Sequence, residues 1–240
     1  MRKRSEISPR AEPGAPEAAG RIGRDVAAFL AEARASPRAR LGRGRLLFAL
    51  DATMSRQPTW DLACRLQAEM FDAASRAGGV EVQLVYYRGH GEARASRWVS
   101  DAAALKRLMT GIACHGGLTQ IGRVLEHANR VAATAPLAAL VFVGDAMEES
   151  ADALCHEAGR LVLRNTRAFL FHEGGDQRAA AVFREIARLT GGAYLPFDAR
   201  AAHELRALLG AVGAFAAGGR TALEASGSAA ARRLLADLSP

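Results

Sequence analysis

The chain has 240 residues, half of them hydrophobic, which is enough to bury one full-sized core but not two of typical size. Its formal net charge is +7, yet residues 1–45 hold eleven Arg or Lys against five Asp or Glu, whereas the remainder is nearly balanced at 21 against 20. The basicity therefore belongs to the N-terminal segment, which argues against a nucleic-acid-binding surface on the rest of the chain.

The cysteines and the apolar runs exclude further classes of protein. Cys64, Cys114 and Cys155 lie far apart and form no CxxC pair, so neither a disulfide framework nor a zinc site is indicated. No stretch of about 18 apolar residues predicts a membrane span, and the basic start is not followed by the apolar run of a secretory signal. We expect a cytoplasmic protein with no membrane contact.

The N-terminal segment 1–44 is rich in Pro, Gly, Ala and charge, so we expect a basic, largely disordered tail. Within it, Val26, Phe29 and Leu30 have helical spacing, which indicates a helix at 22–35. No aromatic residue precedes Phe29, so the tail lacks side chains that stack on bases. A solvated or protein-binding tail is favoured, and nucleic acid is not an expected partner.

The folded part is expected to begin at Arg45. There the apolar run RLLFALD predicts a central strand, buried on both faces and ending in Asp51. Pro58 suits the first turn of the following helix, and VEVQLVYY (80–87) predicts the second strand. The next segment, EARASRWV, follows after a connection too short for a crossover helix and is more polar, which predicts an antiparallel edge strand.

Helices and strands alternate through the rest of the sequence. Helices are expected at 102–112, 121–131, 151–162, 178–190 and 201–217, and strands at LAALVFVGD, 166–171 and 193–197. This alternation predicts an α/β fold over residues 45–218: a doubly wound, mostly parallel six-stranded sheet with one antiparallel edge strand. Residues 219–240 are expected to be a flexible segment with a short helix.

Three of the expected loops carry oxygen ligands. They are DATMS after the first strand, GGLT before a helix and GD at the end of the fourth strand, and they contain Asp51, Thr53, Ser55, Thr119 and Asp145. In an open parallel sheet, ligands bind at the carboxyl ends of the strands, where these loops converge. Alternate residues of an extended turn share a direction, so the first three side chains can point to one place.

Two carboxylates and three hydroxyls form a site of hard oxygen ligands and modest charge. Such a site suits a small octahedral cation that keeps some of its water, so Mg²⁺ or Mn²⁺ is expected. No His or Cys belongs to the set, which argues against zinc.

The motifs DATMS, GGLT and VFVGD, in this order, resemble the metal-ion-dependent adhesion site of von Willebrand factor A domains. The resemblance covers roughly residues 45–218, including the edge hairpin and the final helix. In that family an Asp-x-Ser-x-Ser motif, a Thr and a second Asp bind the metal, which implies the same role for Asp51, Thr53, Ser55, Thr119 and Asp145. Thr53 departs from the family's Ser; it keeps the hydroxyl but narrows the room around the metal.

The resemblance also implies a function, which is non-enzymatic. An acidic side chain of a partner protein is expected to complete the coordination of the metal. Many cytoplasmic bacterial members of the family are adaptors in protein assemblies, some beside ATPases, and this chain is expected to act likewise by analogy of fold.

A haloacid-dehalogenase-like Mg²⁺-dependent phosphatase is the alternative, because Asp51 follows a first strand and GDAMEE resembles the acidic metal loop of that family. That chemistry needs an acid at position 53, where this chain has Thr, and a phosphate-binding lysine, for which only Lys106 in an expected exposed helix is available. A glycine-rich dinucleotide turn and a Walker A motif are both missing from the sequence.

Several neighbours of the motifs have open roles. Glu148 and Glu149 either bind water on the metal or complement a helix dipole. His115 either lines the rim of the site or is a structural or merely exposed residue. Arg56 and Trp60 could frame an acidic ligand, and Trp60 could equally cap the core.

Overall fold

The structure is a computed structural model that describes residues 43–53, 60–62, 70–74, 76–197 and 202–238. They belong to one compact unit, Leu41–Pro240. The expected N-terminal tail with its helix, as well as Ser55 and Arg56, lies outside the described residues.

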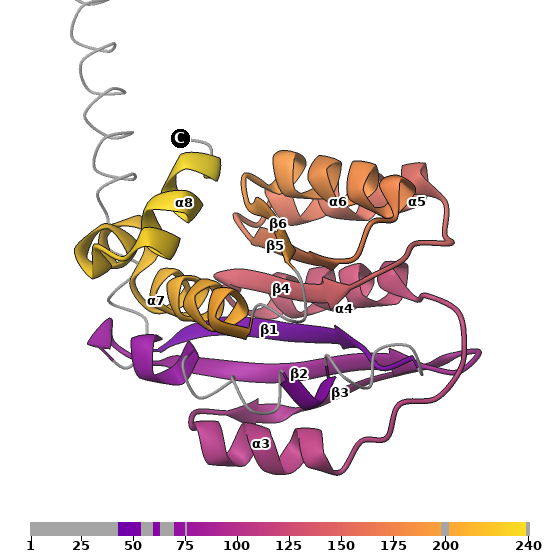
Figure 1. The fold of residues 1–240 in the computed structure, drawn as a ribbon, viewed down its shortest axis with the longest axis horizontal. Coiled ribbons are helices and arrows are strands. Elements are labelled where there is room, and N and C mark those ends of the chain that lie inside the picture. The colour runs from indigo at the N-terminus through magenta and orange to yellow at the C-terminus, as the bar shows by residue number, and fades with distance from the viewer. Residues whose placement is uncertain (1–42, 54–59, 63–69, 75, 198–201, 239–240) are drawn as a thin grey trace, which may run out of the picture. The chain divides into compact units, whose positions relative to one another are not determined.

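Six strands form one sheet in the order β3-β2-β1-β4-β5-β6. Their bounds are β1 Gly44–Asp51, β2 Val80–Arg88, β3 Glu92–Val99, β4 Ala139–Gly144, β5 Arg167–Glu173 and β6 Ala193–Phe197. All neighbours are parallel except β2 and β3, which pair antiparallel. The structure therefore confirms the predicted sheet, with β3 at one edge (Figure 1).

The position of each strand follows from its side chains. The six residues of β4 and the last six of β1 are buried, as expected for parallel strands covered on both faces. By contrast, β3 has only one buried residue, Val99, and its polar and charged side chains suit an edge.

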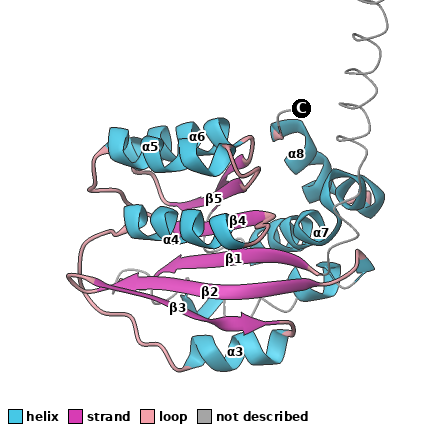
Figure 2. Ribbon diagram, turned by 180° about the vertical axis from the view of Figure 1, so that it is seen from behind, coloured by secondary structure: helices cyan, strands magenta, loops and turns pink. Residues whose placement is uncertain are grey.

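The helices cover both faces of the sheet. Their bounds are α3 Ala102–Thr110, α4 Ile121–Thr134, α5 Ala151–Val162, α6 Gln177–Thr190, α7 Ala202–Ser226 and α8 Ala229–Asp237. Buried residues of α4, α5 and α6 form one core cluster with the sheet, and those of α3, α7, α8 and the short helical stretches 60–62 and 70–74 form the other. Accordingly, α7 lies in front of the sheet in Figure 1, whereas α4 lies in front of it in Figure 2, the view from behind.

The C-terminal segment holds more helix than expected. The helix predicted for 201–217 does leave helical geometry at Gly218 and Gly219, but it resumes and continues to Ser226. Leu223 and Leu234 are completely buried in the core cluster of α7 and α8. Because these leucines cover apolar surface beside the sheet, the segment packs against the domain, and the short helix expected within residues 219–240 corresponds to α8.

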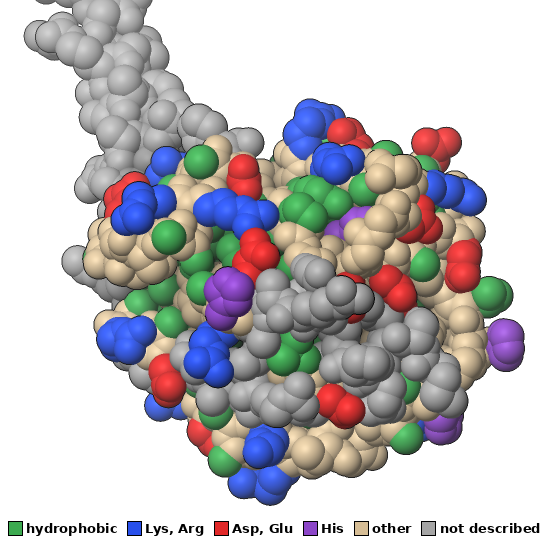
Figure 3. Space-filling view, in the orientation of Figure 1, with side chains coloured by type: hydrophobic (Ala, Val, Ile, Leu, Met, Phe, Trp, Pro, Cys, Tyr) green, Lys and Arg blue, Asp and Glu red, His purple; other side chains and the backbone are tan. Residues whose placement is uncertain are grey.

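The described surface carries charges of both signs. In the space-filling view, Lys or Arg and Asp or Glu side chains are interspersed over the visible face (Figure 3). None of the described helices combines the length and apolarity that a membrane span requires.

Candidate metal site

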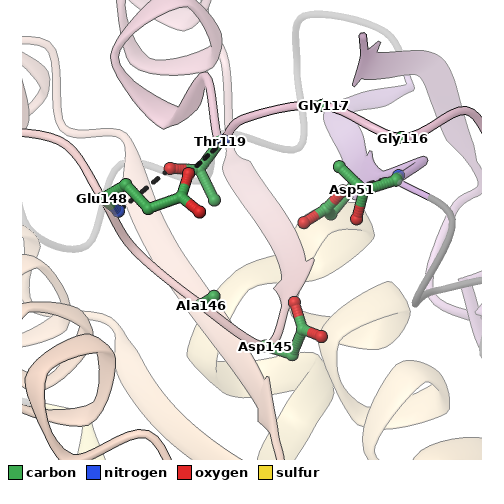
Figure 4. A pocket seen from close by; sticks show the side chains of 8 residues that line it. Asp51, Gly116, Gly117, Thr119, Asp145, Ala146 and Glu148 are labelled. Carbon is green, nitrogen blue, oxygen red and sulfur yellow. Dashed lines mark hydrogen bonds between the residues drawn. The ribbon is translucent and has the colours of Figure 1, made fainter.

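The carboxylates of Asp51 and Asp145 lie at the same edge of the sheet. Asp51 ends β1 and Asp145 directly follows β4, and these strands are parallel neighbours with Leu50 paired to Val143. A hollow of about 190 Å³ lies at this edge. Its lining, most of which is labelled in Figure 4, consists of Asp51, Thr53, Gly116, Gly117, Thr119, Asp145, Ala146 and Glu148.

The turn after β1 is held by the first carboxylate. The Thr53 N–H donates to Asp51 Oδ1 at 2.8 Å, the local bond of an Asx turn. Both side chains are almost buried, with 3% of Asp51 and 8% of Thr53 exposed. This turn thus fixes a carboxylate and a hydroxyl residue next to each other at the wall of the hollow.

Thr119 is held by a reciprocal pair of hydrogen bonds with Glu148. The Thr119 N–H donates to the Glu148 carboxylate at 2.8 Å, and the Glu148 N–H donates to Thr119 Oγ1 at 3.1 Å (Figure 4). A hydroxyl oxygen that accepts one hydrogen bond keeps a second lone pair for a cation. The pair therefore orients the Thr119 hydroxyl and joins its loop to the loop after β4.

Glu149 caps the first turn of α4. Its carboxylate accepts hydrogen bonds from the N–H groups of Ile121 at 2.6 Å and Gly122 at 2.8 Å. The negative charge of Glu149 thus complements the dipole at the N-terminus of α4, and not that of α5, the helix that follows Glu149 in the sequence. This contact supports the reading of Glu149 as a helix cap, whereas Glu148 lines the hollow itself.

Tyr87 lies directly beside Asp51, as its partner in the register of β1 and β2. The side chain is completely buried. Burial raises the pKa of Tyr87 well above its ordinary value, and the negative charge of nearby Asp51 raises the pKa further. The phenol therefore stays protonated, and its hydroxyl, which makes no hydrogen bond with the described residues, lies buried near the Asp51 carboxylate.

His172, at the end of β5, supports the loop of Asp145. Its Nε2 lies 3.3 Å from the Asp145 carbonyl oxygen and its Nδ1 lies 2.8 Å from the Tyr194 hydroxyl. A carbonyl oxygen can only accept, so Nε2 carries the proton and Nδ1 accepts from the tyrosine. Burial lowers the pKa of His172, which favours this neutral form.

Four of the five predicted ligands come together in the hollow: Asp51, Thr53, Thr119 and Asp145. Among the other candidates, His115 is exposed, whereas Trp60 is buried and donates from Nε1 to the Met109 carbonyl at 3.2 Å. Trp60 therefore belongs to the core.

The lining is suited to a hard cation. Its side-chain donors are carboxylate and hydroxyl oxygens, which magnesium and manganese prefer. Within the described part of the chain, no group of three or more His, Cys, Asp or Glu side chains could hold a metal. A cation in this hollow would therefore depend on the threonine hydroxyls and on water as well as on the two aspartates.

Sequence reasoning missed Tyr87 and His172. Each lies one residue before the end of its strand, at the same edge as the predicted ligands, and that position was the available signal. Only the strand register, Asp51 with Tyr87 and Gly144 with His172, shows that they contact the ligand loops.

No protein-family model matches the sequence, and no curated protein does. Solved structures do match in fold. A von Willebrand factor type A protein from Catenulispora acidiphila is 19% identical with a TM-score of 0.58, and the match covers 73% of this chain and 43% of that one. The pilus adhesin SpaC from Lactobacillus rhamnosus GG is 10% identical with a TM-score of 0.59, covering 74% and 30%. Proximal thread matrix protein 1 from the mussel byssus, solved with a zinc-occupied MIDAS motif, is 16% identical with a TM-score of 0.53, covering 70% and 45%. This chain thus matches less than half of the length of each of these structures, and at such identities the likeness concerns the fold.

Proposed function

We propose that this chain, which has the fold of von Willebrand factor A domains, is a divalent-metal-dependent protein-binding module. The observation that carries the proposal is that Asp51, Thr53, Thr119 and Asp145, from three separate loops, line a single hollow. Ser55, two residues beyond Thr53, is the fifth proposed ligand.

The proposed cofactor is Mg²⁺ or Mn²⁺. Asp51 and Asp145 would supply the negative charge, and the hydroxyls of Thr53, Ser55 and Thr119 would complete a site that leaves room for water. When bound, the cation attracts a carboxylate, so an Asp or Glu of a partner protein would take the open position. One of the matched structures carries zinc in its MIDAS motif, which supports a divalent cation at this place in the fold.

The proposed role is non-enzymatic. The phosphatase alternative needs a proton donor two residues after the nucleophile, and position 53 is threonine. Its lysine candidate, Lys106, is exposed on α3, and Lys106 is not part of the lining of the hollow. We further propose, by analogy of fold alone, a cytoplasmic bacterial adaptor that acts in an assembly with an ATPase.

Metal binding tests the proposal directly. Mg²⁺ or Mn²⁺ should raise the melting temperature of the full chain by roughly 5–10 °C at about 100 times its Kd, because a ligand of the native state stabilises by mass action. Asp51→Asn should abolish the rise. Asp72→Asn is the matched control, since this exposed aspartate lies in the helical stretch 70–74, outside the hollow. Equal responses of both variants to the metal would contradict the proposed site.

A further inference from the structure

The loop before α4 holds an exposed leucine on a fixed backbone. Leu118 is 54% exposed and lies between Gly117 and Thr119, two residues that line the hollow. A Cβ at Gly117 would lie 2.1 Å from the carbonyl oxygen of Gly89, so this glycine packs its backbone directly against the β2–β3 turn.

The other side of Leu118 is held as well. The Thr119 N–H is bonded to Glu148, and Gln120 Nε2 donates to the carbonyl oxygens of Arg88 and Gly89, both at 3.3 Å. The backbone on both sides of Leu118 is thus held by packing and hydrogen bonds, and the leucine side chain is exposed. The loop therefore presents an apolar side chain at the rim of the hollow, and a partner that covers it loses little conformational entropy in the loop.

The side of the hollow toward β2 carries cations and histidines. The His115 N–H donates to the Ala52 carbonyl at 2.9 Å, which places this exposed histidine beside the end of β1. Arg123, exposed in the first turn of α4, donates from Nη1 to the Gly91 carbonyl at 2.8 Å. No ion pair joins Arg123 to an acidic side chain within the described residues, so its charge is available to a partner.

The adjacent β2–β3 turn adds to this positive charge. Arg88 and Arg94 share one carboxylate, that of Glu92, at 2.9 and 2.8 Å. Two guanidinium groups around one acid leave a net positive charge, and exposed His90 lies on the same turn.

The side of the hollow toward β5 is mostly acidic. Glu148 lines the hollow, Glu173 ends β5, and Asp176 caps α6. The contact of His172 with the Asp145 carbonyl places the end of β5 beside the candidate metal loop. Arg178 is a cation within this acidic group. The edge thus changes from positive near β2 to negative near β5, with Leu118 and the hollow between.

Resting on the proposed function, we propose that the partner is an acidic protein segment of defined pattern. One Asp or Glu binds the metal, an apolar side chain next to it covers Leu118, and further acidic residues lie over Arg123 and the β2–β3 turn. The opposite direction of the peptide is disfavoured, because it would bring those acidic residues onto Glu148 and Asp176.

Peptide selection on the full chain tests this pattern. A displayed library of random peptides is bound in Mg²⁺ and eluted with EDTA, and the eluted sequences are aligned on their shared acidic residue. The expected result is an apolar residue beside that acid and an excess of acidic residues on one side of it only. An alignment without this pattern, or no peptide released by EDTA, would overturn the inference.

Variants then assign the contacts, with a selected peptide as the probe and saturating Mg²⁺ for each variant. Leu118→Ala should weaken the affinity for the peptide by about tenfold, because it removes a well-packed apolar contact. Leu163→Ala is the matched control, since this leucine is 83% exposed and directly follows the last residue of α5. Arg123→Ala should weaken binding several-fold at low ionic strength and less in high salt. Its control is Arg130→Ala on the same helix.

The outcomes separate the two proposals. If the peptide binds in Mg²⁺, is released by EDTA and is unaffected by Leu118→Ala and Arg123→Ala, the inference is wrong while the metal-dependent function stands. If Mg²⁺ itself does not bind to the chain, the proposed function fails first and the inference fails with it.

Discussion

Replacing Glu149 by alanine should destabilise the whole domain. Its carboxylate accepts two hydrogen bonds from the first turn of α4, and no other side chain among the described residues caps this helix, since Gln120 at the cap position makes no such bond. Losing two partly buried acceptors and a favourable charge at the helix N-terminus costs about 2 kcal/mol. In a domain of this size that corresponds to a fall in melting temperature of roughly 4–8 °C.

Urea denaturation of the metal-free protein measures this loss. Glu149→Gln keeps one acceptor oxygen and loses the charge, so it should cost about half as much. Glu126→Ala is the control, because this exposed glutamate of α4 makes only a 4.0 Å ion pair with Arg130 and its loss should cost less than about 0.5 kcal/mol. A free energy of unfolding that is equal for Glu149→Ala and Glu126→Ala would refute the assignment of Glu149 as the cap of α4.

Three further predictions concern the site and its rim. Tyr87→Phe should weaken Mg²⁺ binding several-fold in calorimetric titration, because it removes the buried hydroxyl near Asp51 and keeps the ring; an unchanged Kd would mean that the hydroxyl does not contribute to the site. Hydrogen bonds from Arg88 and then Arg94 lower the pKa of Glu92 to about 2. The contribution of this cluster to the free energy of unfolding is therefore present above the ordinary carboxyl pKa of 4.5 and is lost as the pH falls through about 2. An NMR titration should show that midpoint, and Arg88→Ala should raise it. Purified protein with Mg²⁺ should not hydrolyse generic phosphomonoesters, and turnover that disappears in Asp51→Asn would favour the phosphatase instead.

Local sequence patterns determined the elements of the fold. Strands β1 and β4 are largely apolar because they are buried on both faces, and strand β3 is polar because it lies at an edge. The same reasoning placed Asp51 and Asp145 at the carboxyl edge, because a residue at the end of a parallel strand must lie there whatever the side chains around it.

Which loops contact one another depends on the tertiary structure and could not be read from the sequence. Glu148 and Glu149 are 27 to 29 residues away from their partners just before and at the start of α4, and no local pattern specifies such a pairing. Tyr87 contacts Asp51, and His172 contacts the Asp145 loop, because of strand order and register. The C-terminal leucines likewise have helical spacing, but the sequence does not show which surface they pack against. Leu234 is buried because the sheet and α7 offer apolar surface there. Sequence thus specified which groups reach the edge, whereas the packing of loops and helices decided which of them touch.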